Sequence, residues 1–130
     1  MSGSGRCECG GVTFIVEGDL RDVFHCYCGR CRHFTGHHMA ATAALPSQVS
    51  FPTAETLSWY SPDPTVEYGF CRQCGSSLFW RAAALPDKLC ICAGALDQPS
   101  GLVTTKAWWV AEAPDYHPRS PGVTEIEFED

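Results

Sequence analysis

Short runs of β-branched and aromatic residues, separated by Gly and Pro, make up most of the chain. Residues 12–16 form such a run after a Gly-Gly turn, and residues 88–93 alternate between two faces. In the second run Leu89, Ile91 and Ala93 share one face, while Lys88, Cys90 and Cys92 share the other. Further candidate strands cover residues 23–26, 37–45, 56–60, 65–70, 76–80 and 102–106.

Helical patterns are weak by comparison. Residues 106–113 could hold a turn or two before Pro114 ends them. The tail after Pro118 is acidic, and its residues 123–128 alternate like an edge strand. Short strands with frequent turns predict a mostly β fold, a small and complex sandwich-like or barrel-like arrangement with little helix.

The composition fits one globular domain over residues 1–130, because single domains cluster at roughly 100–150 residues and no linker or repeat divides this chain. A net charge of −6 and the lack of any Lys/Arg-rich run argue against a nucleic-acid partner. The apolar runs are also far shorter than the roughly 18–20 residues of a membrane span. The oligomeric state leaves no mark in the sequence.

Nine cysteines in 130 residues are the most informative feature of the composition. The first six residues lack the apolar core of a secretory signal, so we expect a reducing, cytoplasmic location. An odd number of cysteines cannot all pair within one chain. In a reduced chain, such richness in cysteine more often reflects metal binding than a disulfide scaffold.

Seven of the cysteines fall into three clusters, in which a tight loop can aim neighbouring sulfurs at one metal ion. The first cluster (Cys7, Cys9) and the third (Cys71, Cys74) supply four sulfurs, which would close a tetrahedral, structural zinc site. That zinc would join the N-terminal strand to the middle of the chain. The alternative interpretation is that these are free buried thiols.

The middle cluster, Cys26, Cys28 and Cys31, supplies three sulfurs within six residues. Three protein ligands and a vacant fourth position are typical of a catalytic zinc. The alternative is a second structural zinc closed by a nearby histidine; the candidates are His25, His33, His37 and His38. Spacing alone does not decide between the open and closed forms. Cys90 and Cys92 are interpreted as small hydrophobic residues or free thiols on a strand face.

Four motifs occur in order along residues 5–116: Cys7-Glu8-Cys9-Gly10-Gly11-Val12-Thr13-Phe14, His25-Cys26-Tyr27-Cys28-Gly29-Arg30-Cys31-Arg32, Phe70-Cys71-Arg72-Gln73-Cys74-Gly75-Ser76 and Gly94-Ala95-Leu96-Asp97. Together they resemble the glutathione-dependent formaldehyde-activating enzyme family, also called centromere protein V-like. Each motif is modest alone, and their order makes the set specific. Residues 117–130 form a tail outside the resemblance.

The resemblance implies a mostly β fold, similar to that of a small nucleotide-release chaperone of Rab proteins. It implies a structural zinc on Cys7, Cys9, Cys71 and Cys74 and a catalytic zinc on Cys26, Cys28 and Cys31. The implied activity joins formaldehyde to glutathione, giving S-hydroxymethylglutathione, which is a carbon–sulfur lyase reaction run in reverse. Cys90 and Cys92 match no ligand position of the family.

Three arginines within or beside the clusters, Arg30, Arg32 and Arg72, are candidates for binding the carboxylates of glutathione. They could equally offset the negative charge of a zinc–thiolate centre. His33 is a candidate proton shuttle, a fourth zinc ligand or a bystander. The main hypothesis is a zinc enzyme that acts on a small thiol–aldehyde adduct. The alternative is a non-catalytic zinc module that binds a partner protein.

Overall fold

The computed structural model describes residues 2–118 and 120–130, and that part of the chain contains two β-sheets and one short α-helix. The strands are β1 (Gly3–Arg6), β2 (Val12–Val16), β3 (Val23–Cys26), β4 (Met39–Ala44), β5 (Val49–Ala54), β6 (Leu57–Asp63), β7 (Val66–Cys71), β8 (Ser77–Ala82), β9 (Leu89–Cys92), β10 (Thr104–Trp108) and β11 (Thr124–Glu125). The helix is α1 (Gly29–Thr35), and short 3-10 helices are η1 (Pro46–Gln48), η2 (Ala93–Ala95) and η3 (Val110–Glu112).

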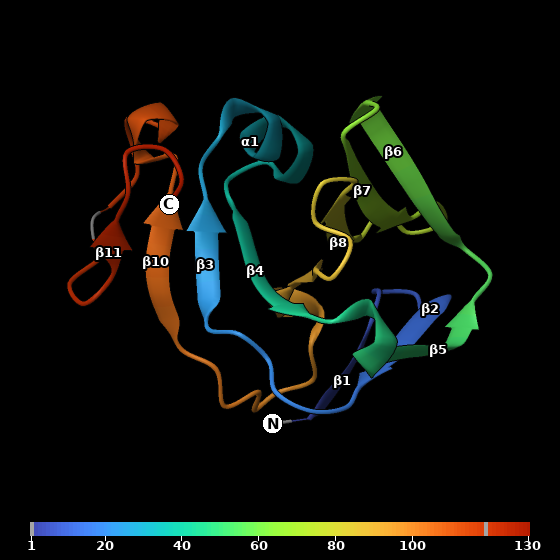
Figure 1. Cartoon of the computed structure of the whole chain (residues 1–130). Helices are drawn as coiled ribbons and strands as arrows, with labels where there is room; N and C mark the ends of the chain where they lie inside the picture. Colours follow the sequence, from blue (N-terminus) through green and yellow to red (C-terminus); the bar gives the residue numbers. More distant parts are fainter. Residues whose placement is uncertain (1, 119) are drawn as a thin grey trace.

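The larger sheet has eight strands in the order β11-β10-β3-β4-β9-β8-β7-β6, and the smaller has the order β1-β2-β5. Neighbouring strands are antiparallel except that β10 pairs in parallel with both β3 and β11. Register shifts between Gly69 and Phe70 and between Tyr60 and Asp63 interrupt the β6–β7–β8 part of the larger sheet. Such irregularities increase twist and bending, and Figure 1 shows this part turning away from β3 and β10.

The smaller sheet packs against one face of the larger sheet and forms the main core with it. Strand β2 alternates, and Val12, Phe14 and Val16 are buried on its inner face. They meet buried residues of β8 and β9, among them Phe79 and Ile91, and the Phe14 and Phe79 rings lie edge to face with centroids 5.2 Å apart. Buried aromatic and aliphatic side chains of this kind supply most of the stability of a small domain.

The opposite face of the larger sheet lies under α1 (Figure 1). Its buried residues, Cys31, Met39, Ala41, Ala43, Tyr68 and Cys90, form a second cluster. Strand β9 separates the two hydrophobic groups as the alternation predicts. Leu89 and Ile91 belong to the main core between the two sheets, and Cys90, with Cys92 packed against it, belongs to the group under α1. Because Ala41, Ala43 and Cys90 are small, this face leaves open space above its centre.

The prediction of a mostly β fold with little helix is confirmed, but several elements differ from expectation. Helix α1 forms where no helix was expected, and β1 and β5 were also missed. The stretch 106–113, expected to hold helical turns, begins as the end of β10 and makes only the 3-10 turn of η3. The reason is parallel pairing: Lys106 and Ala107 are held between β3 and β11, so they stay extended.

Strand β11 confirms an edge strand within residues 123–128, although it spans only Thr124–Glu125. The chain after it keeps close to η3, with backbone hydrogen bonds from Val110 to Ile126 and from Trp109 to Phe128. Within the described residues, none of the helices has the length and apolar character that a membrane crossing requires.

Gly5 provides a test of how closely β1 approaches its neighbours. A Cβ atom at Gly5 would overlap the Phe14 ring and lie 2.5 Å from the Ala95 carbonyl oxygen. We therefore expect Gly5→Ala to lower the free energy of unfolding by roughly 1–3 kcal/mol, the usual cost of overpacking. Urea denaturation of the zinc-loaded protein measures this. Gly94→Ala is the matched control, because a Cβ there meets nothing within 4 Å; equal stability of both variants would contradict the close approach.

Candidate metal centres and cavity

The structure brings the first and third cysteine clusters together. Cys7 and Cys9 lie in the turn between β1 and β2, and Cys71 ends β7 just before the turn that holds Cys74. Their four sulfurs all lie within 4.8 Å of one another, with 3.7 Å between the Cys7 and Cys9 sulfurs and 3.6 Å between those of Cys9 and Cys71. All nine cysteines are free. Tetrahedral zinc–sulfur bonds of about 2.3 Å place sulfurs roughly 3.8 Å apart, so this set fits a zinc ion.

Hydroxyl and backbone N–H groups surround these sulfurs, as expected for thiolates. The Thr56 hydroxyl lies 3.1 Å from the Cys71 sulfur, and the Ser76 hydroxyl lies 3.2 Å from the Cys74 sulfur. The backbone N–H of Val12 donates to the Cys7 sulfur at 3.2 Å. The pKa of Cys74 falls to about 5, because the Ser76 side chain and nearby backbone N–H groups stabilise its charged form. These contacts orient the sulfurs and reduce the cost of holding several thiolates together.

The middle cluster gathers at the junction of β3 and α1. Cys26 ends β3, Cys28 is the N-cap of α1, and the Cys31 N–H donates to the Cys28 sulfur at 3.4 Å. The three sulfurs lie within 4.8 Å of one another, and within the described residues no histidine joins this group. Three convergent sulfurs without a fourth ligand fit the open form of a zinc site.

The histidines considered for the fourth position are directed elsewhere. His25 precedes Cys26 in β3 and so faces the other side of the sheet. Its ring packs at a tilt against that of His38, with centroids 4.1 Å apart. His37 packs on Tyr116, with centroids 5.6 Å apart. His33 is exposed on α1, and its Nδ1 lies 2.7 Å from the Gly29 carbonyl oxygen.

The three thiols of the middle cluster compete for a single negative charge. The pKa of Cys28 falls to about 2, because the Cys26 and Cys31 thiols donate hydrogen bonds to its sulfur. The pKa of Cys26 is raised, because its thiol donates hydrogen bonds to Cys28 and Cys31 and is buried. A divalent cation removes this conflict, because it stabilises all three thiolates at once.

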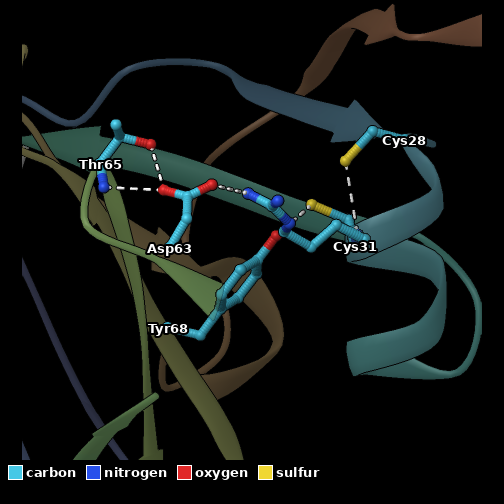
Figure 2. Close-up of polar contacts among 6 residues, drawn as sticks. Cys28, Cys31, Asp63, Thr65 and Tyr68 are labelled. Carbon is cyan, nitrogen blue, oxygen red and sulfur yellow. Dashed lines mark hydrogen bonds and ion pairs between the residues drawn. The ribbon is translucent and has the colours of Figure 1, made fainter. Parts of the chain in front are cut away.

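Tyr68 lies beside the middle cluster, although it is far from it in sequence. Its hydroxyl lies 3.2 Å from the Cys31 sulfur, and both residues are buried (Figure 2). Burial, then the contact with Cys31, raises the pKa of Tyr68, so the hydroxyl stays protonated and can donate to the sulfur. This contact joins α1 to β7 across the concave face of the larger sheet. The sequence gives no signal for it beyond the strand pattern of residues 65–70.

Arg30 is held at the same edge of the site by an ion pair. Its Nη1 lies 3.1 Å from Oδ2 of Asp63. The other oxygen of Asp63, Oδ1, accepts hydrogen bonds from the Thr65 hydroxyl and, at 2.7 Å, from the Thr65 N–H (Figure 2). The hydrogen bonds from Thr65 and then the charge of Arg30 lower the pKa of Asp63. Both ionic side chains are partly exposed, so the pair positions Arg30 more than it stabilises the fold.

A cavity of about 510 Å³ opens beside the middle cluster. Cys26, Cys28 and Cys31 form part of its wall, and Ala41 and Cys90 form part of its floor. Trp80, Trp108 and Trp109 add aromatic wall, while Arg21, Arg30, Glu112 and Glu129 supply charges. This volume suits a small organic ligand. The cavity thus combines a wall of three sulfurs that could hold a metal ion, an apolar body and groups of both charges.

The arginines proposed from the sequence lie in different surroundings. Arg30 lines the cavity. The Nε of Arg32 donates to the Glu112 carbonyl oxygen at 3.2 Å, which ties α1 to η3. Arg72 lies between Cys71 and Cys74, at the four-cysteine group. Sequence analysis missed Arg21, Tyr68 and Glu112 as residues of the cavity region, because no motif surrounds them and only the folded sheet brings them there.

Taken together, the fold and its two sulfur groups define a small β protein with two sets of thiols that could each hold a metal ion, one set of four sulfurs and one set of three beside a cavity. The sequence model of the glutathione-dependent formaldehyde-activating enzyme family matches residues 2–112, and the chain belongs to that family. No curated protein sequence matches the chain.

A solved structure of a Rhodobacter sphaeroides protein, determined as a structural-genomics target, is similar to this one. The TM-score is 0.65 and the sequence identity is 27%, over 81% of this chain and 98% of that chain.

The two sulfur groups predict different responses to losing one ligand. Cys74→Ser should remove one equivalent of zinc and lower the Tm by at least about 10 °C, because that metal joins β1 and β2 to the β7–β8 turn. Cys28→Ser should remove the other equivalent and leave the protein folded. Metal analysis and thermal unfolding followed by circular dichroism measure both effects. Equal loss of stability in the two variants would make both sites structural.

The contact between Tyr68 and Cys31 should tune metal affinity. Removing the hydroxyl with Tyr68→Phe is expected to weaken zinc binding at the middle cluster about tenfold to a hundredfold, the range for partners that orient metal ligands. Competition with a chromophoric chelator measures the change. Tyr60→Phe is the matched control, because Tyr60 pairs directly with Tyr68 between β6 and β7 but is 51% exposed. Unchanged affinity in Tyr68→Phe would show that the hydroxyl plays no part.

Proposed function

We propose that this protein is a zinc-dependent, carbon–sulfur lyase-type enzyme acting on an adduct between a small thiol and an aldehyde. The description of its family suggests glutathione and formaldehyde as the reactants, with S-hydroxymethylglutathione as the adduct. The observation that carries the proposal is the position of the middle cluster. Its three sulfurs converge at the wall of a cavity of about 510 Å³, and no fourth protein ligand joins them from the described residues.

The residues of the middle cluster suit the binding of a thiol substrate. A zinc ion held by Cys26, Cys28 and Cys31 would lower the pKa of a substrate thiol and hold it as a thiolate. Three thiolates leave such a centre with a net charge of −1, which makes it a weaker Lewis acid than a centre with three neutral imidazoles. That difference favours thiol binding over the formation of hydroxide.

The reaction needs little else from the protein. The thiolate sulfur bonds to the aldehyde carbon, the carbonyl electron pair moves to oxygen, and that oxygen takes a proton from water. Cleavage of the adduct is the same step reversed. Around this step, Trp80, Trp108 and Trp109 limit the access of water, and Tyr68 keeps Cys31 oriented through its hydroxyl. Arg30 lies at the cavity wall, where it can meet a substrate carboxylate.

We also propose His33 as a proton shuttle. It is exposed on α1, and its Nδ1 lies beside the Gly29 carbonyl oxygen, so a proton would have to move through Nε2. Arg32 and Arg72 remain proposals as carboxylate-binding residues. The hydrogen bond from Arg32 to Glu112 and the place of Arg72 between Cys71 and Cys74 support a structural role more strongly.

The alternative function is a non-catalytic zinc module that binds a protein partner. A cavity of about 510 Å³ beside three sulfurs favours the enzyme, because a docking module needs an exposed surface and not a cavity of the size that holds a small ligand. We also propose that the chain works as a single zinc-binding domain in a reducing compartment such as the cytoplasm, since free thiols at both sites are needed for metal binding.

The activity is tested by following exchange between formaldehyde, glutathione and their adduct with exchange NMR. The zinc-loaded protein should accelerate the exchange above its spontaneous rate, and Cys28→Ser should abolish the acceleration. Cys92→Ala is the matched control, because Cys92 packs against the same hydrophobic group under α1 as Cys26 and Cys28 but lies outside both sulfur groups. This variant should accelerate the exchange as much as the wild-type protein does. If wild-type protein with both zinc sites filled gives no acceleration with any thiol–aldehyde pair, the enzyme proposal fails and the binding module is favoured.

A further inference from the structure

Residues 126–130 run beside β10 and η3 and form part of one side of the cavity (Figure 1). We call this segment the strap. Its Glu129 is part of the cavity wall. Backbone hydrogen bonds join the strap to β10 and η3; in one of them the Trp109 N–H donates to the Phe128 carbonyl oxygen at 2.6 Å. The strap therefore belongs to the structure of the cavity, although it lies far from the sulfurs in sequence.

Two carboxylates of the strap hold two tryptophans of this wall by their indole N–H groups. The Trp108 indole donates to Asp130 at 2.7 Å, and the Trp109 indole donates to Glu129 at 3.1 Å. Asp130 also pairs with the ammonium group of Lys106 at 2.8 Å. Because Trp108 and Trp109 both line the cavity, the strap fixes the rings that bound this side of it.

The strap is held weakly, and it keeps a neighbouring residue under strain. Trp109 has a φ of 59°, in the left-handed region that is costly for a bulky side chain. The side chains of Lys106 and Asp130 are 32% and 46% exposed, and ion pairs at such exposed positions contribute little stability. Release of the strap would lose weak contacts and relieve the strain. The docked and released arrangements are therefore close in free energy.

Release would change one side of the cavity and leave the rest in place. The middle cluster lies on β3 and α1, and the floor residues Ala41 and Cys90 lie on β4 and β9, which pair with each other within the larger sheet. Without the strap, the Trp109 indole loses its acceptor, and its backbone can leave the left-handed region. The cavity would then widen where Trp108 and Trp109 now close it.

We propose that the strap is a gate of the cavity. When docked, it restricts entry to small molecules, and when released, it admits larger ones. This inference concerns entry and is independent of the chemistry proposed for the middle cluster. The strap also lies beyond residues 2–112, the part of the chain that matches the family model.

The test measures how fast neutral thiol reagents of two sizes reach Cys90 in the zinc-loaded full chain. Cys90 lines the cavity, is 8% exposed and belongs to neither sulfur group. The reagents are iodoacetamide and the larger pyrene maleimide, and tandem mass spectrometry assigns each adduct to Cys90. The readout is the ratio of the two rates, because a change in the pKa of Cys90 alters the thiolate fraction equally for both reagents and cancels.

Removing both carboxylates, in the double variant Glu129→Ala/Asp130→Ala, should release the strap. The rate with pyrene maleimide, relative to that with iodoacetamide, should rise about tenfold, the lower end of the range for lost hydrogen bonds to charged groups. Backbone hydrogen exchange at Trp109, Val110 and Ala111 should also become faster, because their N–H groups donate to the strap.

Two further variants make the test specific. Glu127→Ala is the matched control, because Glu127 belongs to the strap and is exposed, but takes no part in the ion pairs of the described residues; it should change neither quantity. Lys106→Met removes a partner of Asp130 and keeps a long side chain over Phe24. It should raise the ratio by less than the double variant does, and it should add nothing when combined with that variant.

Two results would overturn the gate. If hydrogen exchange becomes faster in the double variant while the ratio of rates is unchanged, release of the strap does not open the cavity. If neither quantity changes, the two carboxylates do not hold the strap. Failure of the thiol–aldehyde exchange assay would leave the gate standing, because the reaction of Cys90 with either reagent needs no catalysis by the protein.

Discussion

The convergence of cysteine sulfurs is the constraint on which the rest of this structure depends. Two pairs that are more than sixty residues apart in sequence meet at one point, with the Cys9 and Cys71 sulfurs 3.6 Å apart. This contact joins the turn between β1 and β2 to the end of β7, and so it sets the smaller sheet against the larger one. A domain of this size buries only part of the surface of its unfolded chain, and a metal ion held between these distant segments would add to its stability.

Once the sheets are fixed, the cavity follows from side-chain size and sheet curvature. The small side chains of Ala41 and Cys90 leave space over the centre of the larger sheet, and Trp80, Trp108 and Trp109 line the cavity around that space. The sheet bends far enough for Tyr68 of β7 to touch Cys31 of α1, although β4, β9 and β8 lie between β3 and β7. The same bend brings Tyr68 to one side of the middle cluster, while the three sulfurs of the cluster line the cavity.

Sequence patterns predicted the parts of the protein that local spacing determines. The cysteine pairs revealed the two sulfur groups, and alternation in β9 correctly separated Leu89 and Ile91 from Cys90. Helix α1 was missed because its seven residues, three of them basic, show no apolar period; its N-terminus is fixed instead by Cys28 and by the Glu112 carboxylate, which accepts a hydrogen bond from Gly29 at 2.6 Å. Arg21 and Tyr68 could not be found locally, because long-range sheet pairing brings them to the cavity.

The residues of the cavity wall come from two parts of the chain. The cysteines, Arg21 and Tyr68 lie within residues 2–112, the part of the chain that matches the family. Glu129 lies beyond it, in a segment that returns alongside β10 (Figure 1) and accepts a hydrogen bond from the Trp109 indole at 3.1 Å. Trp109 has a φ of 59°, costly for a bulky residue, and its N–H donates to the Phe128 carbonyl oxygen at 2.6 Å. The tail thus stabilises a strained tryptophan at the cavity wall. The sulfur groups lie in the part of the chain that matches the family, whereas the shape of this part of the wall depends on the tail.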